Sequence, residues 1–155
     1  MLGEEKPDAA LRINGLGTQN ALSLACKHNL RILAPSTIAA FGPTSPRVNT
    51  PDLTIMRPTT MYGVTKVHTE LLGEYYALKC GLDFRSLRYP GVLSAETLPG
   101  GGTTDYAVDI FYYAARGTPY ECYLRHDTPM PMIHIDDLVR GTIEFLCAEP
   151  ENLQQ

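Results

Sequence analysis

A tyrosine and a lysine stand four residues apart in the segment Tyr62-Gly63-Val64-Thr65-Lys66. On a helix this spacing places the phenol and the ammonium on one face, one turn from each other. A tyrosine titrates near pH 10 unaided, and a cation about 4 Å away at an effective dielectric constant of about 20 favours the phenolate by about 4 kcal/mol before solvation losses. Lys66 would therefore lower the pKa of Tyr62 by up to roughly 3 units, which would make Tyr62 a general base.

Two hydroxyl side chains come before this pair and are candidates to hold a substrate. Ser36 and Thr37 follow an apolar run, residues 30–34, that has the pattern of a buried strand. A hydroxyl at this strand end would orient a substrate alcohol toward the phenolate. Tyr-x-x-x-Lys alone is also typical of an amphipathic surface helix, and Ser36 is equally suited to satisfying backbone groups. The order of strand, Ser-Thr, long loop and Tyr-x-x-x-Lys favours the catalytic interpretation.

The elements that would position these residues alternate between helix and strand. Helices are expected over residues 8–28, from residue 59 or 60 to Gly81, from 100–103 to about 117, and from a cap at Asp136 to about 147. Strands are expected at 30–34, 83–89, 121–124 and 132–135, and the proline-rich segment 42–58 is expected to be a long surface loop. This alternation predicts an α/β fold with a mostly parallel sheet covered on both faces, whose ligands sit at the carboxyl ends of the strands, near residues 35–37 and 90–93.

The composition excludes several classes of protein. With 155 residues, 44% of them hydrophobic and 19% charged, the chain has the make-up of one globular domain, and no apolar run is long enough for a bilayer. The formal net charge of −4, with scattered Lys and Arg, argues against nucleic acid as a partner. The four cysteines and four histidines lack metal-ligand spacing, so free thiols and no metal site are expected. Residues 1–10 show no targeting signal.

The chain resembles the extended short-chain dehydrogenase and epimerase family, whose active site joins a strand-end Ser or Thr to Tyr-x-x-x-Lys. Thr37, Tyr62 and Lys66 match these three positions, and the segments 14–20, 87–91 and 132–138 also resemble the family. The resemblance implies a partial Rossmann-type, doubly wound sheet with NAD as cofactor. It makes Thr37, Tyr62 and Lys66 catalytic, and the residues that it places at the cofactor are Tyr62, Lys66, Pro90, Val92 and Asn14. Asn14 would otherwise cap or pair within its helix.

Within this family, the segments 35–46, 50–54 and 99–107 resemble the short-chain type of L-threonine 3-dehydrogenases, and the likeness spans roughly residues 6–148. It implies oxidation of the L-threonine side-chain hydroxyl to 2-amino-3-ketobutyrate, with hydride passing to NAD. The residues expected to contact the amino acid are Ser36, Thr37, Gly102, Thr103 and Thr104, although the triple glycine would serve equally well as a flexible turn. The resemblance also implies a homodimer for the complete protein, mitochondrial in a eukaryote and cytoplasmic in a bacterium.

A phosphate-binding loop of the family is not found in this chain. Gly15-Leu16-Gly17 has no predicted strand before it and no third glycine at position 20. We therefore expect residues 1–155 to be a partial domain that lacks the N-terminal phosphate-binding segment and holds only the start of a C-terminal substrate region. Such a chain would bind NAD weakly or not at all and have marginal stability. Two alternatives stay open: a nucleotide-sugar epimerase or dehydratase with the same three residues, and a non-catalytic fragment or pseudoenzyme.

Overall fold

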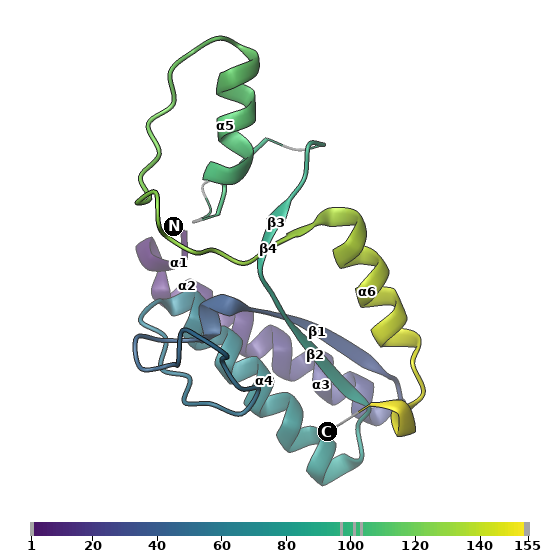
Figure 1. Cartoon of the computed structure of the whole chain (residues 1–155). Coiled ribbons are helices and arrows are strands. Elements are labelled where there is room, and N and C mark those ends of the chain that lie inside the picture. Colours follow the sequence, from purple (N-terminus) through teal and green to yellow (C-terminus); the bar gives the residue numbers. More distant parts are fainter. Residues whose placement is uncertain (1, 97, 101, 103, 154–155) are drawn as a thin grey trace. The chain divides into compact units, whose positions relative to one another are not determined.

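The computed structural model describes residues 2–96, 98–100, 102 and 104–153. The chain divides into two compact units, a larger one that combines Leu2–Tyr89 with Ile143–Gln155 and a smaller one that covers Pro90–Thr142. Each contains a pair of parallel strands, β1 with β2 in the larger unit and β3 with β4 in the smaller. The predicted α/β class with parallel strands is confirmed (Figure 1). Among the described helices, none has both the length and the apolar content needed to cross a bilayer.

The larger unit begins with an almost continuous helical segment. It consists of α1 (Leu2–Glu5), α2 (Pro7–Leu11), the π-helical turn η1 (Arg12–Leu16) and α3 (Gly17–Lys27). The predicted helix over residues 8–28 is confirmed, but it is not uniform. The wide π-turn interrupts it around Asn14 and Gly15, and such turns inside helices are frequent at functional sites.

A strand–helix–strand unit forms the centre of the larger unit. β1 (Ile32–Thr37) pairs in parallel with β2 (Phe84–Tyr89), in a register that runs from Ile32 opposite Phe84 to Thr37 opposite Tyr89. The long helix α4 (Met61–Cys80) connects them, and the short helical turn η2 (Ile38–Ala40) follows β1 directly. β1 extends three residues further than predicted, so that Ser36 and Thr37 belong to the strand itself.

Helix α4 begins and ends at the residues that the sequence predicted. The Thr60 side chain caps its first turn by accepting a hydrogen bond from the Gly63 amide at 3.1 Å, and Gly81 ends it with φ of 67°, a left-handed conformation that glycine adopts freely. A Cβ at Gly73 would lie 2.1 Å from the Phe84 ring, so α4 packs closely on β2. The core beside α3 and α4 consists of Leu22, Ala25 and Leu82, with Ile32, Leu72, Tyr76 and Phe84 packed against them.

The smaller unit differs more from the prediction. β3 (Gly91–Leu93) pairs with β4 (Met132–His134), and α5 (Tyr106–Ala115) and the start of α6 (Ile135–Cys147) complete the unit. The predicted loop at 90–93 is partly strand β3, and Asp136 lies in the first turn of α6 instead of capping it. The strand predicted at 121–124 was wrong, because those described residues form no regular element. There the Tyr123 ring packs edge-on against Tyr106, a contact that does not require strand pairing.

Candidate active site

The first turns of α4 are seated against the carboxyl end of β1. The Lys66 ammonium donates a hydrogen bond to the Pro35 carbonyl at 2.7 Å. A Cβ at Gly63 would lie only 2.3 Å from the Ala39 carbonyl oxygen, so a glycine is required for the helix to approach η2 this closely. These two contacts place the Tyr-x-x-x-Lys segment beside the strand end that carries Thr37.

Tyr62 and Lys66 share one face of α4, as their spacing predicted. The Lys66 Nζ lies 5.7 Å from the centroid of the Tyr62 ring, within the range of a cation–π contact. Tyr62 is 42% exposed. Burial lowers the pKa of Lys66 below its usual value, because desolvation disfavours the ammonium.

Thr37 and Ser36 point to opposite faces of β1, as successive strand residues do. The Thr37 hydroxyl oxygen accepts a hydrogen bond from the Ala39 amide at 3.2 Å, which leaves its own proton for another acceptor. Ser36 is buried, and its hydroxyl donates to the Glu70 carboxylate. The hydroxyl of Ser36 is thus engaged as a donor within the protein, whereas the Thr37 hydroxyl is engaged as an acceptor.

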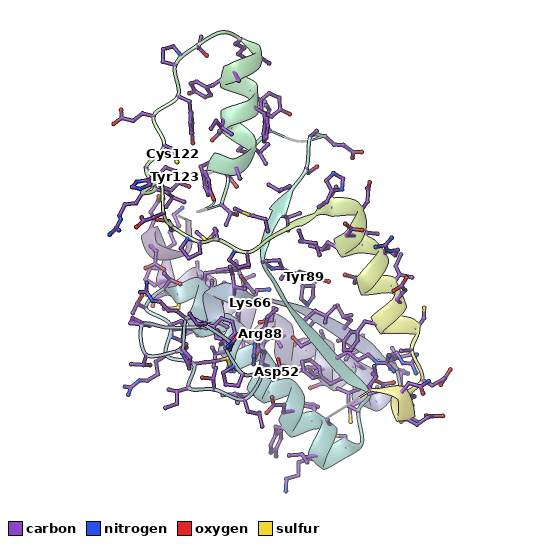
Figure 2. All side chains as sticks on the ribbon, in the orientation of Figure 1. Asp52, Lys66, Arg88, Tyr89, Cys122 and Tyr123 are labelled. Atoms are coloured by element: carbon purple, nitrogen blue, oxygen red, sulfur yellow. The ribbon has the colours of Figure 1, made fainter. Side chains whose placement is uncertain are left out.

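Glu70 and Arg88 form a buried ion pair that sequence reasoning missed. The Glu70 side chain is 5% exposed, and Arg88 holds its carboxylate through Nη2 at 2.7 Å and through Nε at 3.1 Å. Arg88 lies beside Asp52 (Figure 2) and donates to its carbonyl at 2.9 Å. Its guanidinium also lies over the Phe41 ring. The hydrogen bond with Glu70 raises the pKa of Arg88. This network joins β1, α4, β2 and the 42–58 loop, and an arginine in a predicted buried strand was the signal that a partner had to exist.

Asn14 reaches the site through an intermediate residue. Its side-chain amide donates to the Thr65 hydroxyl at 3.0 Å, and Thr65 in turn donates to the Tyr62 carbonyl at 2.9 Å. Thr65 is almost completely buried. Asn14 therefore pairs across helices, from the π-turn to the turn of α4 that carries Tyr62.

The predicted residues of the smaller unit lie on β3 and on the turn before α5. Pro90 immediately precedes β3, and Val92, in its centre, is 36% exposed. A Cβ at Gly91 would lie 2.9 Å from the Thr104 side chain, so Thr104 packs directly on this strand.

Gly102 has a structural partner in the same turn. Its amide donates to the Asp105 carboxylate at 2.7 Å, just before α5 begins. Thr103 lies outside the described residues. The turn at Gly102 thus serves at least to start α5, which is one of the two roles that the sequence left open.

Among the described residues, no group of three or more His, Cys, Asp or Glu side chains is arranged to hold a metal ion. All four cysteines are free thiols, as expected.

Residues 2–154 match the model of the NAD dependent epimerase/dehydratase family. The chain belongs to this family. Mitochondrial L-threonine 3-dehydrogenase from Bos taurus is 55% identical over 152 residues, which are 98% of this chain and 41% of the bovine protein. The crystal structure of L-threonine dehydrogenase from Phytophthora infestans is 56% identical with a TM-score of 0.95, and the match covers 99% of this chain and 50% of that one.

A more distant match is a UDP-glucose 4-epimerase from Thermotoga maritima. Its structure is 25% identical with a TM-score of 0.80, and the match covers 92% of this chain and 46% of that one. The chain spans half the length or less of all three proteins. The family resemblance and the Rossmann-type class predicted from the sequence are confirmed.

Proposed function

We propose that this chain carries the catalytic residues of an NAD-dependent L-threonine 3-dehydrogenase, which oxidises the threonine side-chain hydroxyl to give 2-amino-3-ketobutyrate. The observation that carries the proposal is the position of Lys66, bonded to the end of β1 and adjacent to the Tyr62 ring. Identity above 50% to the bovine and Phytophthora enzymes supports the choice of substrate.

Each residue has a distinct task in the proposed reaction. Thr37 donates its free hydroxyl proton to the substrate oxygen and so holds the alcohol in place. Tyr62, as phenolate, removes the alcohol proton. The Lys66 ammonium favours the phenolate electrostatically, because a positive charge beside the ring stabilises a developing negative one. NAD, when bound, accepts the hydride from the carbon that bears the hydroxyl.

The residues present fit one side of an NAD molecule. An ammonium has three N–H donors, and one of those on Lys66 goes to Pro35, so two are left to bind ribose hydroxyls. In the proposal Tyr62 lies beside them, and Pro90 and Val92 border the nicotinamide. The Asn14 amide is held by Thr65, so we assign Asn14 a positioning role instead of a direct contact with NAD.

For the amino-acid substrate, we retain Thr37 as the hydroxyl contact and keep Gly102, Thr103 and Thr104 as proposed contacts to the amino and carboxyl groups. Ser36 is left out, because Glu70 already accepts its hydroxyl proton.

We also propose that the complete protein is a homodimer. Apolar side chains on two helical segments of the larger unit are strongly exposed: Ile13, Leu16 and Leu24 along η1 and α3, and Leu71, Tyr75 and Leu78 along α4. Exposed apolar rows of this kind mark protein interfaces. The bovine relative is named as mitochondrial, and we propose the same compartment for a eukaryotic member.

The experiment measures NADH formation by its near-ultraviolet absorbance with L-threonine and NAD. This chain is compared with a form extended upstream to include a phosphate-binding loop. We expect activity in the extended form and its loss, by about 100-fold or more, on Tyr62→Phe, because general acid–base groups contribute about 10² to 10⁴. Tyr75→Phe, on the same helix and 55% exposed, is the matched control and should keep full activity.

Three outcomes would overturn the proposal. Full activity in Tyr62→Phe would remove the assigned base. If the extended protein does not oxidise L-threonine but converts a nucleotide sugar, the epimerase alternative is correct. Absence of activity with both substrates would favour a non-catalytic chain.

A further inference from the structure

Two cysteines that the proposed reaction does not use lie at the ends of neighbouring helices. Cys26 is in the last turn of α3, and Cys80 is the last residue of α4. The two helices pack against each other beside the Leu22 core. Cys80 is fourteen residues beyond Lys66, or roughly 20 Å along the helix axis at 1.5 Å per residue, so the pair is remote from the proposed site.

The two cysteines are neighbours at the surface of the larger unit. Both line the same surface pocket, together with Arg31 and Asp83. The neighbouring Cys80 thiol, followed by burial, raises the pKa of Cys26. Cys80 is exposed while Cys26 is half-buried. A soluble reagent therefore meets Cys80 first, and Cys26 lies on the same pocket.

We propose that Cys26 and Cys80 are a modification site that forms a reversible disulfide on contact with a small-molecule disulfide of the glutathione class. The Cys80 thiolate attacks one sulfur of the reagent, breaks its S–S bond and releases one thiolate. Cys26 loses its proton to solvent and attacks the Cys80 sulfur of the mixed disulfide, and the second reagent thiolate leaves. Two protein thiols lose two electrons and two protons in total, and the reagent gains both to become two thiols.

The bond would close a segment of the chain that contains the whole proposed catalytic set. Thr37, Tyr62 and Lys66 all lie between positions 26 and 80 in the sequence. A cross-link over such a long segment restricts the unfolded chain most, and it would tie the carboxyl ends of α3 and α4 together. This consequence does not depend on which substrate the protein uses.

The test uses the full chain with Cys122→Ser and Cys147→Ser, so that only the two proposed cysteines remain. After incubation with oxidised glutathione, free thiols are counted with a chromogenic disulfide and the intact mass is recorded. We expect both thiols to disappear in a monomer whose mass falls by about 2 Da, the two hydrogens of disulfide formation, and to return with a reductant. A peptide digest should join the segment around Cys26 to the one around Cys80.

Adding Cys26→Ser to the same background isolates the first step. We expect that variant to keep a stable glutathione adduct on Cys80, because no second thiol can displace it. The proposal is wrong if the two-cysteine protein instead ends with separate adducts on both thiols, with a covalent dimer, or with both thiols unreacted.

Discussion

Replacing Glu70 by glutamine removes one charge from the buried network behind the strand end while keeping the size of the side chain. The Ser36 hydroxyl still finds a carbonyl oxygen to accept its proton. The Arg88 guanidinium loses one of its two acceptors, because one of the oxygens that it contacts becomes an amide nitrogen that only donates.

The expected loss follows from burial and from the contacts that remain. Removing one partner of a buried ion pair costs about 3–5 kcal/mol, because the other charge is left without compensation. The side chains of Glu70 and Arg88 are 5% and 24% exposed, and Arg88 keeps its hydrogen bond to Asp52 and its contact with Phe41. Water can reach Arg88 in part, so we expect the lower end, about 3 kcal/mol, or roughly a 100-fold lower folding equilibrium constant.

Urea unfolding of the wild type and Glu70→Gln measures this loss. The chain has no tryptophan, so far-ultraviolet circular dichroism is the suitable signal. The double variant Glu70→Leu with Arg88→Met is the control, because apolar replacement of a whole buried pair is often neutral. We expect the double variant to lose less unfolding free energy than the sum of the losses in Glu70→Leu and Arg88→Met made separately. A free energy of unfolding for Glu70→Gln within about 0.5 kcal/mol of wild type would refute the reasoning.

Three further changes test other contacts. Gly63→Ala should lower both activity and stability, because its Cβ must displace α4 from the Ala39 carbonyl, and an unchanged crystal structure of the variant would contradict this. Thr60→Ala should cost about 1 kcal/mol of unfolding free energy in urea, whereas Thr60→Ser should cost little. Arg85, with Arg31, lowers the pKa of Asp83 below its usual 3.8, so Asp83 stabilises the fold above that pH and the gain is lost as pH falls through the lower, folded value. Asp83→Asn should therefore reduce the fall in unfolding free energy as the pH is lowered. An equal fall in the wild type and the variant would exclude the contacts of Asp83 as its cause.

The elements best predicted from the sequence are those whose ends carry their own chemical signal. Helix α4 has a threonine cap at Thr60 and a left-handed glycine at Gly81, and both of its ends were predicted within two residues. The same holds for β2, which ends at the tyrosine before Pro90. In each case the signal is local, so tertiary contacts were not needed to find it.

The features that were missed depend on residues far apart in the sequence. β3 has only three residues, and it exists because Gly91–Leu93 pairs with a segment some forty positions later. The partnership of Glu70 with Ser36 and Arg88 likewise joins three different elements. A strand was also expected at residues 121–124, but no partner strand is paired with them in the described structure.

The candidate reactive residues could be proposed from the sequence, whereas the residues that hold them in position could not. Tyr62, Lys66 and Thr37 carry reactive groups at a recognisable spacing, so the sequence alone was enough to propose them. The direction of each of the two adjacent hydroxyls depends on the pleat of β1, and the sequence did not reveal where that strand ends. Extending the strand through Thr37 turns Ser36 toward Glu70, which is why we propose Thr37 and not Ser36 as the substrate contact.

The larger unit holds its site with buried polar groups more than with an apolar core. Across the described residues, the buried apolar residues are Leu22, Ala25, Ala40 and Leu82, whereas the buried polar ones are Ser36, Ser45, Thr65, Thr69, Glu70 and Arg85. Hydrogen bonds between such groups are directional, so they set the orientation of neighbouring elements more narrowly than methyl groups do. An unpaired buried polar group is also costly. Substitutions in this network should therefore lower stability and activity together, whereas substitutions of the exposed Tyr62, the proposed base, should lower activity alone.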